Sequence, residues 1–451
     1  MEKNTSVKLM IRSLIVASIC FVIVYILNLT GVFNFLEYKT YDSRMKSTAV
    51  KFHTSDEITL IVVDQESITW AKEEKGWGWP WPREAYGHIV DFMSAGNASS
   101  IAFDIIFSEP SLYGNNDDIS FGESERKSGK VIQTLFVDGD TVTYPVPEIN
   151  DNAAIIGNIT SCMDSDDVIR RARVYFDYNG KKYPSLGFAS LELTGDDFSS
   201  IKTDKDGAVL IRYPKSSDDY YTVNAKTILQ SYDAWINGTE GDFVPSDFEG
   251  TYSFVAYYAP GLFDICSTPV AQTFPGVGVH IAALDSFLND TFITKINLFI
   301  SLLFILLLSF FGSLVVAFVE SQARGRFKIV FLTLGLILGL AIASVIPFIL
   351  FANNVWIELV APLVAFISSY MISLALNYII EGKQKRFIKS AFSQYLSPAV
   401  IEQLVDNPDK LTLGGERREI SIYFSDVQGF TSISEKLSPQ KLTEVLNYYL
   451  S

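Results

Sequence analysis

The sequence predicts a multidomain membrane protein: a mixed α/β domain, four transmembrane helices and a short α+β segment at the carboxyl end. Four apolar runs of about 20 residues, each long enough to cross a bilayer, predict the helices. Between the first two runs, residues 34–294 alternate short apolar strands with helical patterns, as expected of an α/β domain. A chain of 451 residues is too long for one core, so several units are expected.

The apolar runs predict that part of the chain lies in a lipid bilayer. They are residues 13–33, 296–319, 329–351 and 355–380; residues 1–12 precede the first, and residues 381–418 follow the last as linker helices. No clean small-residue cleavage site follows the first run, so we expect a retained anchor and not a signal peptide. Glu358 is the one acidic residue in the runs and lies near an end, which favours an interfacial position over a buried functional one.

Basic residues flank the apolar runs unevenly. Lysine and arginine precede the first run, join the second to the third and follow the fourth, whereas Asn353-Asn354, between the third and fourth, has none nearby. The positive-inside rule then places the amino terminus in the cytoplasm and residues 34–294 outside the cell or in the periplasm. Those residues hold 20 Lys and Arg against 39 Asp and Glu, a balance that favours solubility over a cation site; no nucleic-acid partner is expected.

The elements expected within the α/β domain can be placed in order. They are a strand at 58–63, a helix whose first residue is Pro82, a strand at 101–107, a hairpin of 174–178 with 181–183 around Asn179-Gly180, and a strand at 253–258. Strand, helix and strand joined by short links predict a right-handed crossover and a parallel core.

Two acidic residues and two tryptophans form a candidate sensor pocket. Asp64 and Asp104 are expected near the carboxyl ends of neighbouring parallel strands, the edge where open α/β sheets bind ligands. Trp79 and Trp81 could line such a pocket. The other interpretation, which is the commoner role of such residues, is that the carboxylates cap helices or turns and the tryptophans pack beneath a loop.

The carboxyl-terminal segment carries a second candidate site. Residues 420–425 alternate apolar and polar side chains, which predicts a half-buried strand with Asp426 on its apolar face. A buried carboxylate needs a metal, a donor set or an opening to solvent. Gly429 allows a sharp turn, after which the N–H groups of Gly429, Phe430 and Thr431 would form a phosphate-binding helix start. The alternative is that Asp426 is an ordinary turn residue.

The Phe-Ser-Asp-x-x-Gly-Phe-Thr pattern ending at Thr431 resembles the first strand and loop of class III adenylate and guanylate cyclases, and the likeness runs from Ser393 to Leu450. The resemblance implies a cytoplasmic ferredoxin-like α+β domain from residue 419 that converts ATP to 3′,5′-cyclic AMP and pyrophosphate. Asp426 would be one of two carboxylates that hold two divalent cations, Mg²⁺ or Mn²⁺, with the Val427 carbonyl as a further ligand. Gly429, Phe430 and Thr431 would contact the triphosphate.

In that family the substrate lies between two catalytic domains, which implies a homodimer whose linker helices transmit the outer signal. The apolar stripe of the linker could instead pack on its own catalytic domain. The second carboxylate and the transition-state residues would lie beyond Ser451, so this chain alone is expected to be inactive. A guanylate cyclase, and a non-catalytic membrane sensor or scaffold with a cyclase remnant, remain as alternatives.

Residues 34–294 resemble the second type of CHASE domain, an extracellular sensor attached to bacterial cyclases and histidine kinases. The likeness is carried by the segments 36–46, Val63-Asp64 with Glu66-Ser67, 79–83, 103–110, Arg170-Arg171, 264–269 and 275–288. It implies an extracellular ligand, which the sequence does not identify, and one membrane anchor before the sensor with about three after it, as found here. Cys162 and Cys266 both fall in this domain and could pair if they lie close together.

Overall fold

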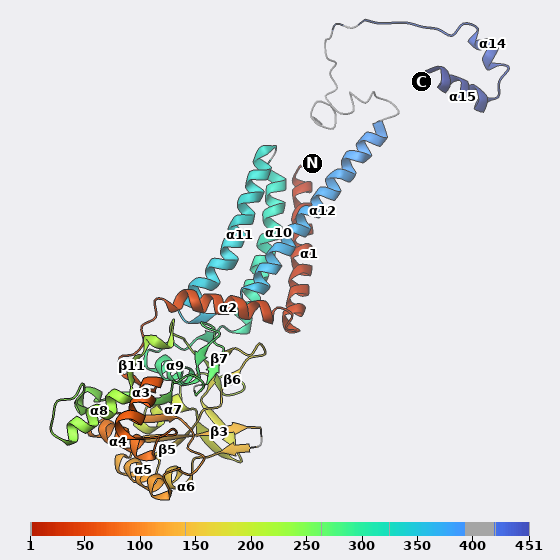
Figure 1. The fold of residues 1–451 in the computed structure, drawn as a ribbon. Helices are drawn as coiled ribbons and strands as arrows, with labels where there is room; N and C mark the ends of the chain where they lie inside the picture. The colour runs from red at the N-terminus through yellow and green to blue at the C-terminus, as the bar shows by residue number, and fades with distance from the viewer. Residues whose placement is uncertain are drawn as a thin grey trace. The chain divides into compact units, whose positions relative to one another are not determined.

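A computed structural model describes residues 2–139, 141–262, 264–323, 325–392, 419 and 421–450. The chain divides into two compact units, Met1–Leu376 and Asn377–Ser451. The first contains the α/β domain and the apolar helices beside it (Figure 1). Ile420 and most of the expected linker, residues 393–418, lie outside the described residues.

Six parallel strands form the central sheet of the α/β domain, in the order β11-β1-β12-β2-β3-β5, and β4 pairs antiparallel with β3. The strands are β1 (Ile58–Val63), β2 (Ser100–Asp104), β3 (Val131–Asp138), β4 (Thr141–Thr143), β5 (Ile155–Asn158), β11 (Tyr221–Asn224) and β12 (Tyr252–Tyr257). All six residues of β1 are buried, as expected of a strand covered on both faces. The strands predicted at 58–63 and 253–258 are confirmed, whereas the run 101–107 leaves the sheet after Asp104.

Strands β1 and β2 are parallel, as predicted, but they are not neighbours. Strand β12 lies between them: Ile58 pairs with Tyr252, and Tyr252 pairs with Ser100 on its other side. The expectation that Asp64 and Asp104 follow neighbouring strands is therefore wrong. The inserted strand comes from far along the chain, and a local apolar pattern does not show which distant strand it pairs with.

Helices cover both faces of the sheet. One face packs against α3 (Gln65–Trp70), the π-helical turn η1 (Ala71–Lys75), α4 (Arg83–Ala95), α5 (Asn115–Ser128), α6 (Pro147–Asn150), α8 (Ala225–Ile236) and the turn η3 (Pro245–Phe248). The other packs against α7 (Leu186–Thr194) and α9 (Gly276–Leu288). Along β1, Ile61 and Val63 enter the first core and Leu60 and Val62 the second, since successive side chains of a strand alternate. Pro82 caps α4 and does not begin it.

A smaller sheet, in the order β10-β7-β6, lies beside this core. Its strands are β6 (Cys162–Met163), β7 (Ile169–Arg173) and β10 (Ala208–Leu210). Nearby are the predicted hairpin, β8 (Tyr175–Tyr178) with β9 (Lys181–Pro184), the pair β13 (Ile265–Cys266) with β14 (Phe274–Pro275), and the turn η2 (Ser217–Asp219). Asn179 and Gly180 have positive φ angles of 51° and 77°, the conformation of a primed hairpin turn. Cys162 and Cys266 are free thiols, so the disulfide is not formed.

Four long apolar helices fit a multi-pass membrane protein: α1 (Glu2–Leu29), α10 (Leu298–Gln322), α11 (Arg326–Ala352) and α12 (Val360–Phe392). Hydroxyl groups join α10 to α1, since Ser309 donates to the Ala17 carbonyl at 2.9 Å and Ser313 to the Ser13 carbonyl at 2.8 Å. The fourth helix begins later than the predicted 355. Val355–Trp356 is instead a short strand, β16, paired with β15 (Thr294–Lys295), which ties the α11–α12 loop to the α/β domain.

The unit Asn377–Ser451 contains two further short helices, α14 (Phe430–Ser434) and α15 (Pro439–Leu450). The strand predicted over 420–425 is not formed, because the described residues 421–427 have no regular secondary structure. Ile422 is 67% and Phe424 88% exposed. A strand is held by hydrogen bonds to a neighbouring strand, and no strand to pair with is present among the described residues of this unit.

Candidate functional site

Helix α2 (Asn34–Ala49) lies between the α/β domain and the bundle of apolar helices (Figure 1). Its buried residues lie three or four positions apart, or side by side, and so form one stripe: Glu37, Tyr41, Arg44, Met45, Thr48 and Ala49. Two of these six side chains are charged, and buried charges persist only where they are paired. The partners of α2 are therefore the first place to look for a built site.

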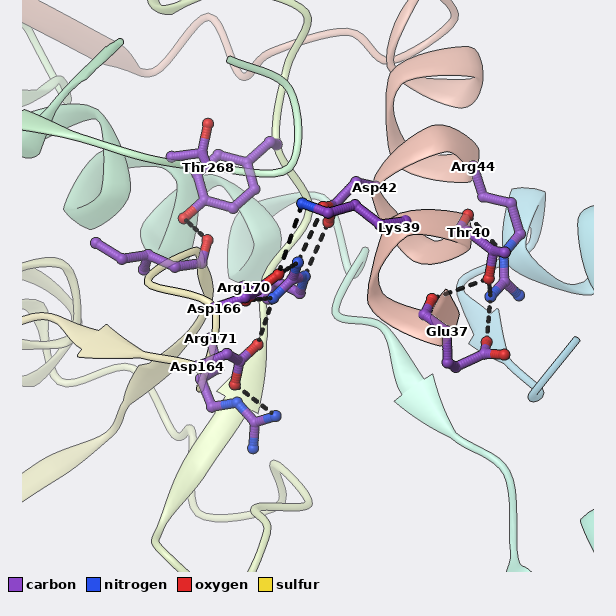
Figure 2. Close-up of polar contacts among 12 residues, drawn as sticks. Glu37, Lys39, Thr40, Asp42, Arg44, Asp164, Asp166, Arg170, Arg171 and Thr268 are labelled. Atoms are coloured by element: carbon purple, nitrogen blue, oxygen red, sulfur yellow. Dashed lines mark hydrogen bonds and ion pairs between the residues drawn. The ribbon is translucent and has the colours of Figure 1, made fainter. Parts of the chain in front are cut away.

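One side of α2 binds the small sheet through Arg170 of β7 (Figure 2). The Arg170 guanidinium donates two hydrogen bonds to the Asp42 carboxylate, at 2.8 and 2.9 Å, in the paired geometry that arginine and carboxylate favour. It also donates to Asp166 at 2.7 and 2.9 Å and to Asp164 at 3.0 Å. The Arg170 side chain is only 1% exposed. Among the described residues, these three carboxylates are the groups that neutralise its charge.

The charges around Arg170 form a network and not a single pair. Arg171 contacts Asp164 at 3.0 Å and Asp204 at 2.7 Å. Burial lowers the pKa of Arg170, but its hydrogen bonds to Asp166 and Asp42 outweigh this and raise the pKa above its ordinary value. The hydrogen bond from Arg170 in turn lowers the pKa of Asp166. Arg170 and Asp166 therefore stay ionised over the physiological pH range.

Glu37 and Arg44 lie on the side of α2 opposite Asp42 (Figure 2), and Glu37 holds the start of α12. The Glu37 carboxylate accepts hydrogen bonds from the backbone N–H groups of Leu359 and Val360, at 2.9 and 3.0 Å, and from the Trp356 indole at 3.1 Å. These N–H groups have no partner within α12, so Glu37 caps the helix from another helix and places negative charge at its positive end. Arg44 neutralises Glu37 at 2.6 Å.

Arg44 adds a second link between α2 and the loop before α12, because it donates to the Ile357 carbonyl at 2.9 Å. Within α2 it also donates to the Thr40 carbonyl at 3.1 Å. Burial lowers the pKa of Arg44, although the adjacent Glu37 carboxylate opposes the effect. A buried ion pair thus joins α2 to the first turn of α12.

Aromatic residues fill the space between these two sets of polar contacts. Tyr41 packs edge-on against Phe351, at the end of α11, and against Trp356, with ring centroids 4.9 and 5.0 Å apart. Arg212, which follows β10, donates to the Phe351 carbonyl at 3.2 Å. The end of α11 therefore contacts both α2 and the α/β domain, and the start of α12 contacts α2.

The contacts of α2 with Arg170, with the end of α11 and with the start of α12 together form the α2 junction. Glu358 lies before the first turn of α12 and takes part in this junction. It pairs with Lys295 at 3.2 Å and accepts a hydrogen bond from Asn28, near the end of α1, at 3.0 Å. The prediction of a position near a helix end is confirmed, and the partners show that Glu358 connects three segments of the chain.

A comparison with protein-family models matches residues 18–314 to the CHASE2 domain. The chain belongs to the CHASE2 family. The match spans the end of α1 from residue 18, all of α2 and the α/β domain, and α10 as far as residue 314. No curated protein and no solved structure matches the chain. The CHASE2 match does not reach the segment at 420–431, and it identifies the α/β domain as a sensor of the kind used in signal transduction.

The acidic residues of the predicted sensor pocket have separate roles in the CHASE2 domain. Asp64 caps α3, since its side chain accepts a hydrogen bond from the Ser67 N–H at 2.8 Å, so the capping interpretation is correct for this residue. Asp104 is half-buried at the end of β2, where burial, with a smaller effect of the Asp264 carboxylate, raises its pKa to about 7.

The two tryptophans pack against other aromatic rings. Trp81 is 1% exposed and lies 6.1 Å from Trp79 and 6.0 Å from Tyr86 between ring centroids. Trp79 is half-buried and packs edge-on against Tyr257, at the end of β12, at 5.1 Å. The packing interpretation is therefore correct for Trp81. Trp79 joins the loop before α4 to the sheet.

The residues of the predicted metal and phosphate site lie on an exposed turn. Asp426 is exposed and accepts a hydrogen bond from the Val427 N–H at 2.9 Å, while the Val427 carbonyl accepts one from Phe430 at 3.2 Å. Gly429 has a φ of 75° and precedes α14, so the predicted helix start at Phe430 and Thr431 is confirmed. The described residues contain no group of three or more potential metal ligands. One carboxylate and one carbonyl are fewer ligands than a site for two cations needs.

The reasoning from sequence alone did not assign a role to Glu37, Asp42 or Arg44. Both α2 and Arg170-Arg171 carried the CHASE resemblance, but nothing in either segment predicted that they touch. A signal was present: charged residues occupy the apolar stripe of a 16-residue helix, where an unpaired charge would be very unfavourable.

Proposed function

We propose that the chain is a membrane receptor in which the CHASE2 domain acts on α12 through α2. The observation that carries this proposal is the pair of contacts on opposite sides of α2: Asp42 holds Arg170 of the sensor, and Glu37 holds the first turn of α12. A shift of the sensor sheet that moves Asp42 must displace Glu37 as well, because both belong to one short helix. The contacts thus join the sensor to the helix that leads onward to residue 392.

For sidedness we propose that the CHASE2 domain is extracellular or periplasmic. Helices α1 and α11 begin, and α10 ends, at the end of the bundle away from the CHASE2 domain (Figure 1). Lys8, Arg12, Arg326 and Lys328 lie near that end, and the positive-inside rule favours the cytoplasm for it.

For the output we propose a class III nucleotidyl cyclase that forms cyclic AMP from ATP, as a homodimer. The motif at residues 420–431 supports this proposal, together with its position after α12. Asp426 and Val427 would be ligands of divalent cations, and Gly429, Phe430 and Thr431 would contact the triphosphate. Because the described residues do not assemble a two-cation site, these roles rest on the motif alone.

The test is cyclic nucleotide formation in membranes of cells that express the intact gene, supplied with Mn²⁺ and either ATP or GTP. We expect cyclic AMP from the wild type and a loss of about 100-fold or more in Asp426→Ala, as when a group that stabilises charge at the reaction centre is removed. Glu444→Ala, an exposed acidic residue of α15, is the control for expression and folding.

Each outcome has a defined meaning. Retained activity in Asp426→Ala would refute the metal role of that residue. If cyclic GMP is the main product, the activity is that of a guanylate cyclase and not of an adenylate cyclase. If neither product forms in the wild type, the non-catalytic sensor is the better description of this protein.

A further inference from the structure

A cavity of about 470 Å³ lies in the CHASE2 domain beside the α2 junction. Its volume is within the range of small-molecule binding sites. The wall includes Tyr38 of α2, Arg171 and Arg173 of β7, Ser161, Ser165 and Phe176. A second cavity, of about 320 Å³, shares Tyr38 and Arg171 with it, so space is open on two sides of Arg171.

The strand pattern of the small sheet places both arginines in the same wall. Residues 171 and 173 are two apart on β7 and therefore project from the same face, opposite to the face of Arg170. In the ladder Arg171 pairs with Cys162 of β6, and Arg173 pairs with Ala208 of β10. Cys162 and Ala208 also line the cavity, so its floor is this sheet.

The two guanidinium groups differ in what they already bind. Arg171 is neutralised by Asp164 and Asp204. Arg173 forms no ion pair within the described residues, and it lies over the Phe176 ring at 5.3 Å. A guanidinium stacked on a ring keeps its edge free for a planar or tetrahedral anion.

Buried donors in this wall lack acceptors. The Nε atoms of Arg171 and of Arg173 are both buried, and neither finds a hydrogen-bond partner in the described part of the chain. Both atoms are too buried for a molecule in the cavity to reach, so the terminal nitrogen atoms of Arg173 are the donors that an anion would meet. Asp206, on the exposed part of the wall, is the nearby carboxylate that works against an anion, whereas Asp164 is already bound by Arg170 and Arg171.

We propose that this cavity binds a small anion, a carboxylate or a phosphate group, through Arg173. The proposal rests on the receptor function proposed above and deepens it by naming the class of ligand. Tyr38 and Asp164 form part of the cavity wall that the bound anion contacts. Asp164 is hydrogen-bonded to Arg170, which in turn holds α2 through Asp42. The ligand therefore acts on the junction from inside the sensor.

The test is calorimetry on the purified full chain in lipid nanodiscs, titrated separately with acetate and with inorganic phosphate at constant ionic strength. We expect one of the two to bind with a Kd below about 10 mM, and Arg173→Ala to weaken that binding at least about tenfold, as when a charge-assisted hydrogen bond is lost. Arg126→Ala, an exposed arginine of α5, is the matched control and should bind like the wild type. The probe that binds identifies the acid class.

A second variant, expected to bind more tightly, keeps the test decisive if Arg173→Ala fails to fold. Asp206 is exposed, so Asp206→Asn should fold normally and bind the anion severalfold more tightly because a repelling charge is removed. The proposal would be overturned if neither acetate nor phosphate binds, if the wild type and Arg173→Ala bind with equal affinity, or if Asp206→Asn binds more weakly than the wild type. The readout is binding alone, so a failed cyclase assay would not affect it.

Discussion

Replacing Glu37 by alanine should be the most damaging single change at the α2 junction. The Glu37 and Arg44 side chains are 8% and 4% exposed, so solvent screens their 2.6 Å contact very little. Removing one partner of a buried ion pair costs about 3–5 kcal/mol, because the other charge stays buried and unpaired. The variant also leaves the N–H groups of Leu359 and Val360 without their acceptor.

Two measurements check this expectation. Equilibrium unfolding in lipid–detergent micelles should show Glu37→Ala less stable by about 3–5 kcal/mol, and the double variant Glu37→Ala/Arg44→Met should recover part of the loss, because no unpaired charge remains. Hydrogen exchange should accelerate at residues 359 and 360. Lys46→Ala, on the exposed side of α2, is the control. A loss below about 1 kcal/mol, or strictly additive effects in the double variant, would refute the buried-pair description.

Two other sites give clear expectations. Arg170→Lys should destabilise the CHASE2 domain nearly as much as Arg170→Ala, because an ammonium group cannot form the paired contacts that reach Asp42, Asp164 and Asp166 together; full rescue by lysine in thermal unfolding would contradict the network. Burial raises the pKa of Glu125 to about 8, despite a hydrogen bond from Gln133 at 2.5 Å. Because the folded-state pKa lies above that of the unfolded chain, the stability contributed by protonated Glu125 is fully present below about pH 4.5 and is lost as the pH rises to about 8, by roughly 1.4 kcal/mol per pH unit. Glu125→Gln should remove this dependence from unfolding measured across that range, and an unchanged pH profile would refute it.

Sequence reasoning located the local elements of the CHASE2 domain well. The continuous apolar run of β1 and the Asn179-Gly180 turn are dictated by neighbouring residues, and both were predicted. The position of β12 between β1 and β2 depends on pairing between residues far apart in sequence, which no local pattern contains. For this reason Asp64 and Asp104 were placed too close together.

The same limit explains what was missed at the junction. Glu37 was visible as a charge in an apolar stripe, but its partners are the backbone N–H groups of Leu359 and Val360, which carry no side-chain signature. The anion cavity depends on which of two adjacent arginines, Arg170 or Arg171, faces α2, and that follows from the strand register. Capping by Asp64, in contrast, needs only residues three positions apart and was foreseen.

The insertion of β12 governs the order in which the domain can form. Strand β1 has β11 on one side and β12 on the other, so both of its neighbours are synthesised after residue 220. Until then the two long edges of β1 have no partner, and β2 can pair only with β3. Contacts of such large sequence separation make folding slow and leave strand edges open to intermolecular pairing. A chain interrupted before Tyr252, where β12 begins, therefore keeps a gap in the middle of its sheet and is expected to aggregate.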